Sequence, residues 1–130
     1  MDLNDKQVGK NKDMNASFKH AKNGIKTAFI SERNMKYHVS FGVLALILGI
    51  LLPLSVSEWL WLVGVIFIVL IVEVINTSFE YLVDLVVGES FHPIAKQVKD
   101  MAAGAVLLSA MLSLIVGGII FIPKLIQWIR

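Results

Sequence analysis

Five polar side chains capable of acid–base and metal chemistry recur on one helical face of an otherwise apolar stretch. They are Glu73, Asn76, Thr77, Glu80 and Asp84. At roughly 100° of turn per residue, these positions fall within about a third of the helix circumference. Acids are costly on a helix of membrane length, so their presence indicates a working site. The alternative is a polar interface that only joins helices, although such interfaces more often use Ser, Thr or Asn.

The composition of the 130-residue chain indicates the environment of this helix. Hydrophobic residues make up 56% of the sequence and the mean hydropathy is +0.72, too apolar for so small a soluble domain. Uncharged stretches cover residues 39–57, 59–72 and 101–123. Each can cross a hydrocarbon layer of about 30 Å as a helix, once the second is extended through Glu73. We therefore expect an all-α integral membrane protein with transmembrane helices over about 36–54, 58–86 and 94–122.

Basic residues are distributed unevenly around the three expected crossings. Eight lysines and arginines precede Val39, two lie between the second and third crossings, and two follow the third. The positive-inside rule then places the N-terminus and the second loop in the cytoplasm. The three tryptophans are expected at the outer interface: Trp59, Trp61 and Trp128.

The segment before the first crossing divides into two parts. Residues 1–14 are polar and mixed in charge, which predicts a flexible tail. Over about 15–31, apolar residues recur at helical spacing and lysines occupy the other side, which predicts an amphipathic helix on the inner membrane surface. An ordinary soluble amphipathic helix is the alternative. Residues 31–35 are expected to form a polar elbow, and residues 15–130 a single domain.

The connection to the third crossing brings further polar groups to the cytoplasmic side. Residues 88–93 predict a tight hairpin, because Gly88 supplies turn freedom and Pro93 restarts a helix. Small side chains at four-residue spacing then favour close helix packing: Ala105, Ser109, Ser113 and Gly117. Packing of the third crossing on the second is expected to bring Lys99 and Asp100 beside Glu80 and Asp84.

Known soluble phosphate-binding and nucleophile motifs are missing from the sequence. It contains no G-x-x-x-x-G-K-[ST] loop, no G-x-G-x-x-G and no nucleophile elbow. With no cysteine, disulfides are excluded. The three histidines are dispersed, and we expect a functional role chiefly for His92. The remaining carboxylates, amide and lysine suit magnesium, which prefers one or two protein carboxylates together with substrate phosphates.

Three blocks of sequence resemble the small membrane-integral prokaryotic lipid kinases, the diacylglycerol kinases and undecaprenol kinases. The blocks are I-S-E-R-N around Glu32, E-V-I-N-T-S-F-E-Y-L-V-D from Glu73 to Asp84, and K-D-M-A-A-G-A-V from Lys99. The resemblance covers roughly residues 15–120. The I-S-E-R-N elbow is more similar to the undecaprenol-type branch, and the hairpin G-E-S-F-H-P-I-A-K departs from the diacylglycerol-type pattern.

The resemblance implies a lipid kinase with ATP and Mg²⁺ as cofactors. The acceptor would be a lipid alcohol, with undecaprenol favoured and diacylglycerol as the alternative. The family also implies a homotrimer in a bacterial cell membrane, with cytoplasmic active sites shared between neighbours. Membrane lipids are the other expected partners, and nucleic acid is not expected.

The same resemblance implies roles for individual residues. Glu73 resembles the general base, Asn76 its polar companion, and Lys99 a group that neutralises charge on the transferring phosphoryl group. Glu32 and Glu80 resemble the pair that holds Mg²⁺ on the nucleotide phosphates. The further candidates for nucleotide contact are Gly88, His92, Asp100 and His20.

Two other classes of protein remain as alternatives. A proton-coupled transporter could use Glu73 as a proton carrier, but transporters need access from both faces and usually carry a repeat, which this sequence lacks. A non-catalytic scaffold could use the polar face for oligomerisation. Phosphoryl transfer fits the polar set well, because its loose transition state needs positioning and charge neutralisation more than covalent help.

Overall fold

Four helices make up most of the structure, a computed structural model that describes residues 14–130. They are α1 (Met14–Ser31), α2 (Arg33–Leu51), α3 (Val56–Val87) and α4 (Pro93–Ile129). Three of them, α2, α3 and α4, are long and apolar enough to cross a membrane. The prediction of an all-α protein with three transmembrane helices is therefore confirmed. The expected flexible tail lies outside the described residues, apart from Met14.

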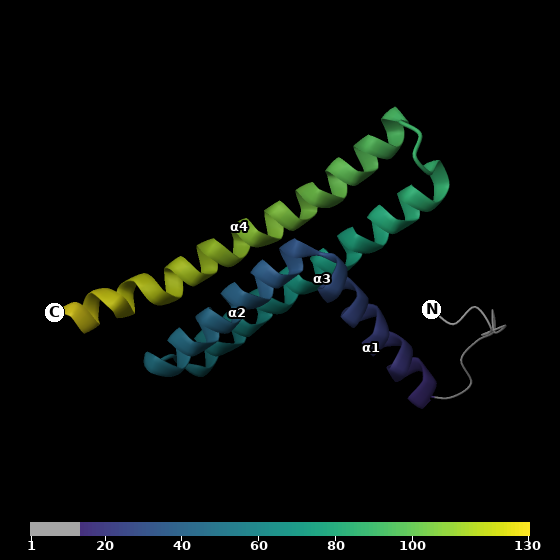
Figure 1. Cartoon of the computed structure of the whole chain (residues 1–130). Coiled ribbons are helices and arrows are strands. Elements are labelled where there is room, and N and C mark those ends of the chain that lie inside the picture. Colours follow the sequence, from purple (N-terminus) through teal and green to yellow (C-terminus); the bar gives the residue numbers. More distant parts are fainter. Residues whose placement is uncertain (1–13) are drawn as a thin grey trace.

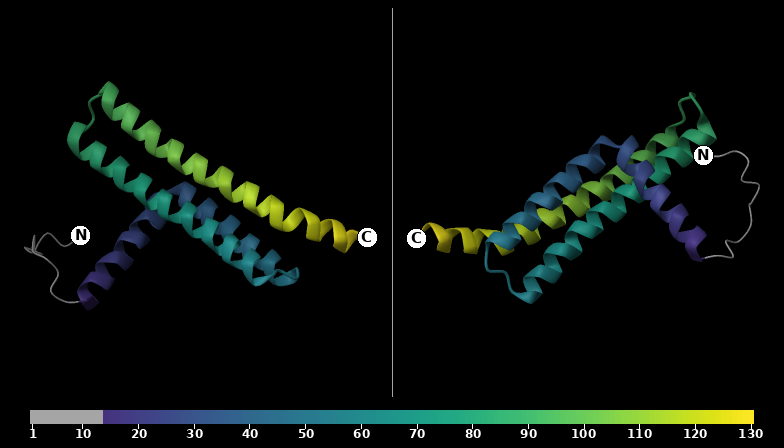
Figure 2. Two further views of the ribbon diagram at one scale, coloured as in Figure 1. Left: turned by 180° about the vertical axis from the view of Figure 1, so that it is seen from behind. Right: turned by 60° about the horizontal axis from the view of Figure 1, so that its bottom comes forward.

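Helix α1 diverges from the other three helices, as Figures 1 and 2 show. Its last turns pack on α2 and α3, and Ala28 is buried there. Large apolar side chains such as Phe18 and Ile25 stay exposed on it. An exposed apolar face opposite a row of lysines is typical of a helix that lies in a membrane interface.

The elbow between α1 and α2 is narrower than the sequence indicated. Only Glu32 leaves the helical conformation, with φ −102° and ψ 121°. Its backbone N–H still donates to the Ala28 carbonyl at 3.1 Å. One extended residue is enough to redirect the chain, so α2 begins at Arg33 rather than at about residue 36. The Glu32 side chain makes no capping hydrogen bond, so its carboxylate is available for other contacts.

The link between α2 and α3 is held by a capping box and by a residue of α4. The Ser55 hydroxyl accepts a hydrogen bond from the Glu58 N–H at 3.2 Å, and Glu58 Oε2 accepts one from the Ser55 N–H at 2.7 Å. Lys124 Nζ donates to the Pro53 carbonyl at 2.9 Å and lies 3.1 Å from Glu58 Oε2. These contacts tie the far part of α4 to the α2–α3 link.

Helices α3 and α4 form a long antiparallel pair joined by the hairpin at residues 88–92 (Figure 1). At about 1.5 Å per residue they extend roughly 48 and 56 Å, so both exceed a hydrocarbon layer of about 30 Å. Gly88 ends α3 with φ +58°, a conformation that favours glycine. Helix α4 continues through Pro123 to Ile129 instead of ending near residue 122, as membrane helices tolerate proline.

Helix α3 is the central helix, packing on α2 and α4. Its buried residues form one face that changes from apolar to polar along the chain: Leu62, Val65, Val69, Glu73, Asn76, Thr77 and Val83. Trp59, expected at the outer interface, is half-buried and packs over Gly49 of α2. Trp61 and Trp128 are exposed, and the position of the three tryptophans at the outer interface stays a prediction.

Candidate active site

The polar face of α3 is graded from complete burial to exposure. Glu73 is 0% exposed, and Asn76 and Thr77 are also buried. Glu80 is half-buried and Asp84 is exposed. The Thr77 hydroxyl donates to the Glu73 carbonyl at 3.0 Å, and Asn76 Nδ2 donates to Glu80 Oε1 at 3.1 Å. The Asn76–Glu80 hydrogen bond agrees with the predicted shared face, and burial falls along this face from Glu73 to Asp84.

The buried carboxylate of Glu73 lacks the hydrogen bonds that such a group normally has. Neither of its oxygens has a hydrogen-bond partner within residues 14–130, and the same holds for Asn76 Oδ1. Because Asn76 lies three residues after Glu73, the two side chains are neighbours on the helix surface. Buried polar atoms are nearly always paired, and an exception indicates a functional site. These three acceptor oxygens suit a ligand that brings a hydrogen-bond donor, such as a hydroxyl group.

Two further carboxylates lie near Glu73. Glu32 at the α1–α2 elbow and Glu80 on α3 are both half-buried, and both are close enough for their charges to act on Glu73. Over the described residues, no group of three or more His, Cys, Asp and Glu side chains is placed to hold a metal ion. A pair of carboxylates fits Mg²⁺ that arrives with nucleotide phosphates, since those phosphates and water complete its coordination.

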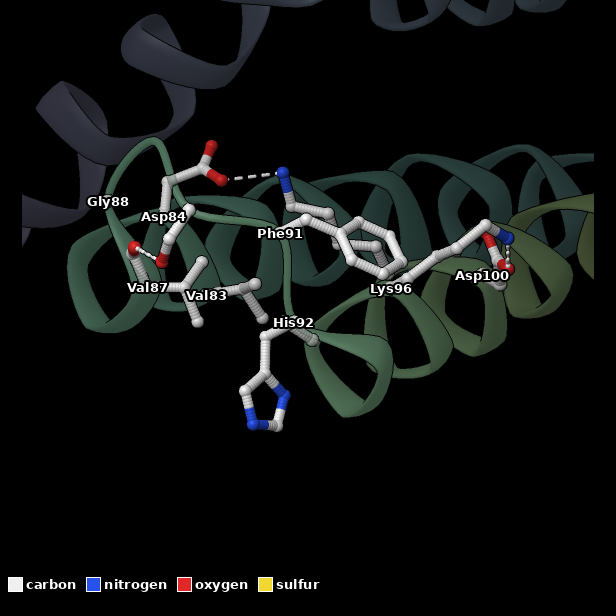
Figure 3. A pocket seen from close by; sticks show the side chains of 11 residues that line it. Val83, Asp84, Val87, Gly88, Phe91, His92, Lys96 and Asp100 are labelled. Carbon is white, nitrogen blue, oxygen red and sulfur yellow. Dashed lines mark hydrogen bonds and ion pairs between the residues drawn. The ribbon is translucent and has the colours of Figure 1, made fainter.

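A pocket of about 290 Å³, with both polar and apolar lining residues, lies at the α3–α4 hairpin (Figure 3). Lys99 Nζ lies 2.6 Å from Asp84 Oδ1, which joins α4 to α3 inside this pocket. Lys96 is paired with Asp100 one turn along α4. The expectation that Lys99 lies beside Asp84 is thus met. The residues lining the pocket are Val83, Asp84, Val87, Gly88, Ser90, Phe91, His92, Ala95, Lys96, Lys99 and Asp100.

Three of the four residues predicted to contact the nucleotide line the hairpin pocket, and the fourth does not. His92 caps α4, with its Nδ1 accepting a hydrogen bond from the Ile94 N–H at 3.2 Å. The His92 ring points away from Asp84 in Figure 3. His92, Gly88 and Asp100 all line the pocket, whereas His20 is exposed on α1 and is not among the lining residues. The roles of these four residues stay predictions.

The buried carboxylate of Glu73 and the hairpin pocket lie at different positions along the axis of α3. Glu73 and Asp84 are eleven residues apart, which is about 17 Å or roughly three turns along α3. Glu80 lies between them. A ligand that contacts both positions must therefore be elongated, with an anionic part that suits Lys99.

Sequence reasoning missed one residue at the site, His38 of α2. Its Nε2 lies 3.8 Å from Glu73 Oε2. The dispersed positions of the histidines gave no local spacing that links His38 to Glu73, which is 35 residues further along the chain. The available signal was an ionisable residue at the start of a membrane-length stretch, which is itself an indication of function.

Comparison with known proteins identifies the family. Residues 19–121 match the model of the prokaryotic diacylglycerol kinases. The undecaprenol kinase of Bacillus subtilis is 42% identical over 109 residues, which cover 84% of this chain and 88% of that protein. A diacylglycerol kinase of Synechocystis sp. is 41% identical over 111 residues, or 85% of this chain. That match covers 63% of the Synechocystis protein, so the chain spans less than two thirds of its length.

A more distant relative is also a kinase by name. The diacylglycerol kinase of Escherichia coli K12 is 27% identical over 92 residues, covering 71% of this chain and 75% of that protein. All three relatives are thus named as kinases of a lipid alcohol, and the family match spans the elbow, the polar face of α3 and the hairpin. The chain therefore belongs to the prokaryotic diacylglycerol kinase family of membrane lipid kinases.

Proposed function

We propose that this chain transfers the γ-phosphoryl group of ATP to the hydroxyl of undecaprenol at the cytoplasmic face of a bacterial cell membrane. The observation that carries the proposal is the fully buried carboxylate of Glu73, which lies on a membrane-length helix. Neither oxygen of this carboxylate has a hydrogen-bond partner within residues 14–130. A general base for a lipid hydroxyl has to lie in the membrane-spanning part of the chain, where a membrane lipid can reach it. It also has to lie near the membrane surface, because the lipid hydroxyl lies there.

Glu73 and Asn76 act on the lipid acceptor. The Glu73 carboxylate accepts the proton of the lipid hydroxyl as that oxygen attacks the γ-phosphorus. Asn76 is held by its hydrogen bond to Glu80, which leaves Oδ1 as a second acceptor near the hydroxyl. The two side chains together orient the hydroxyl for attack.

The nucleotide occupies the region between the hairpin pocket and Glu73. Lys99 lies in the pocket and neutralises charge on the phosphates, while Gly88, His92 and Asp100 contact the nucleotide. Glu32 and Glu80 would hold Mg²⁺ together with the nucleotide phosphates, and the chemistry that the ion would supply there is charge neutralisation. The interval of about 17 Å between Asp84 and Glu73 suits a ligand with a chain of phosphates.

The choice of undecaprenol over diacylglycerol is supported by the extent of the similarity. The match to the undecaprenol kinase covers 88% of that protein, against 63% of the Synechocystis diacylglycerol kinase. Diacylglycerol is the second candidate, since the identities of 42% and 41% are nearly equal. We also propose a homotrimer, which the family resemblance supports.

Parallel assays with both lipids test this proposal. The purified protein is mixed in one detergent with Mg²⁺, γ-labelled ATP and either undecaprenol or diacylglycerol, and the lipid product is measured. We expect label in both lipid fractions or in undecaprenol alone, with the higher kcat/KM for undecaprenol. A higher kcat/KM for diacylglycerol would reverse the choice of acceptor. No label in either lipid would contradict the kinase and leave the transporter or the scaffold.

A further inference from the structure

His38 is the titratable side chain that contacts the buried carboxylate from a second helix. It lies in the second turn of α2, and its Nε2 is 3.8 Å from Glu73 Oε2. This distance is longer than a hydrogen bond, and catalytic hydrogen bonds are often long in ligand-free sites and tighten when the substrate binds. The His38 side chain keeps 20% of its surface exposed, against 1% for Glu73. His38 therefore connects the enclosed carboxylate with the outside of the chain.

A base at this position needs a route by which its proton leaves. Glu73 gains one proton per turnover and must lose it before the next hydroxyl binds. The other polar neighbours on α3 are engaged, since Thr77 donates to a backbone carbonyl and Asn76 donates to Glu80. Glu32 and Glu80 are the acids whose charges act on Glu73, and the proposed function assigns both of them to Mg²⁺. Imidazole is the side chain that gains and loses a proton near neutral pH.

We propose that His38 is a positioning residue for Glu73 that also takes the substrate proton from it. The lipid O–H bond breaks as the lipid oxygen bonds to the γ-phosphorus, and the γ-phosphorus–oxygen bond to ADP breaks with its electron pair on ADP. The proton passes to Glu73 Oε2 and then to Nε2 of neutral His38. The imidazolium then releases a proton from Nδ1 to water, which leaves the Nε2–H tautomer of neutral His38. Proton exchange with water returns the hydrogen from Nε2 to Nδ1, which restores both groups. This inference rests on the proposed lipid kinase activity.

Two substitutions of His38 separate proton transfer from packing. His38→Ala removes the imidazole, and His38→Gln keeps a polar side chain of similar length that does not take up a proton at neutral pH. We expect kcat to fall about 10- to 100-fold in both variants, which is at or below the lower limit of general acid–base effects because Glu73 itself is retained. The KM for ATP is expected to stay within about twofold, because His38 is not among the residues that line the hairpin pocket.

Chemical rescue gives the readout that a purely structural role would not produce. Imidazole added to His38→Ala is expected to restore activity at least about fivefold, whereas pyrazole, which has nearly the same shape but is a very weak base, is expected to restore none. The matched control is Ser40→Ala, an exposed position on the same helix whose hydroxyl donates to the Lys36 carbonyl. This control and the wild type should keep full activity and show no response to either compound.

Each result decides the inference. Wild-type kcat in either His38 variant, or equal rescue by imidazole and pyrazole, would show that His38 only packs against Glu73. If His38→Ala does not fold, the kcat of His38→Gln decides alone. A wild type that phosphorylates neither lipid would remove the proposed function itself, which distinguishes that failure from the failure of His38.

Discussion

The five polar residues on α3 differ mainly in how much water reaches them. Glu73 at 0% exposure has no hydrogen-bond partner for its carboxylate within residues 14–130, which is unfavourable for stability. Asp84 is 57% exposed and paired with Lys99, and such surface pairs contribute little to stability. The buried acid is therefore the residue whose presence folding alone does not explain. The exposed pair holds Lys99 in the pocket.

The substitution Glu73→Gln tests the base directly. Glutamine keeps the size of the side chain but accepts no proton, so we expect lipid phosphorylation to fall by at least about 100-fold while the protein stays folded. Activity and thermal unfolding are measured together. The matched control is Glu58→Gln, the same change at the other end of α3, where glutamine can still form the capping box. Near-normal turnover of Glu73→Gln would remove Glu73 from the role of base.

The carboxylates proposed to hold magnesium have a separate test. Glu32→Ala and Glu80→Ala are each expected to raise the Mg²⁺ concentration for half-maximal activity by about tenfold, since each removes one oxygen ligand. The measurement is a Mg²⁺ titration at saturating ATP. Glu89→Ala, an exposed acid of the hairpin, should titrate as the wild type does. A Mg²⁺ titration that is unchanged in both variants would count against the metal pair.

At the scale of elements, α2 packs closely on α3 where α2 carries glycine. A Cβ atom built at Gly49 would lie 2.9 Å from Cη2 of Trp59 and 3.3 Å from side-chain atoms of Leu54 and Leu62. The ring of Trp59 is too bulky to move aside without disturbing this contact. The close approach sets the position of α2 along α3, and His38 reaches Glu73 because of that position.

Gly49→Ala is expected to destabilise the protein by about 1–3 kcal/mol through overpacking, partly offset by the higher helix propensity of alanine. The measurement is the thermal unfolding midpoint in detergent. Gly64→Ala is the matched control, because a Cβ atom at Gly64 meets nothing within 4 Å. Its midpoint should equal or exceed that of the wild type. An unfolding midpoint for Gly49→Ala as high as that of the control would show that the two helices are not in close contact there.

The elements were largely predictable from the sequence because their signals are local. Apolar length, the Gly88 and Pro93 turn signals and the helical spacing of the α3 acids each depend on neighbouring residues. The end of α4 was misjudged because the expected crossing ended with the uncharged stretch 101–123, although the helix continues through Pro123 to Ile129. The contact between His38 and Glu73 depends on how α2 packs along α3, which no local pattern contains.

At the scale of the whole molecule, the polar groups gather toward one end of the helix bundle. The elbow at Glu32 and the hairpin at residues 88–92 lie toward the same end, and the α2–α3 link lies at the other (Figures 1 and 2). Helices α3 and α4 extend past the start of α2 at the hairpin end. The polar face of α3 from Glu73 to Asp84 thus begins where α3 lies beside α2 and continues into the part of α3 that projects beyond α2.

The orientation of this polar end follows from charge and has a direct test. Ten of the twelve lysines and arginines precede Val39 or lie near the hairpin, so the positive-inside rule predicts that this end faces the cytoplasm. Because the chain has no cysteine, single cysteines report on each side without background. In intact cells, a membrane-impermeant thiol reagent should label Ser57→Cys at the α2–α3 end and leave Glu89→Cys in the hairpin unlabelled. After lysis both should react. Labelling of Glu89→Cys in intact cells would place the hairpin pocket outside the cytoplasm, away from ATP, and would contradict the proposed kinase.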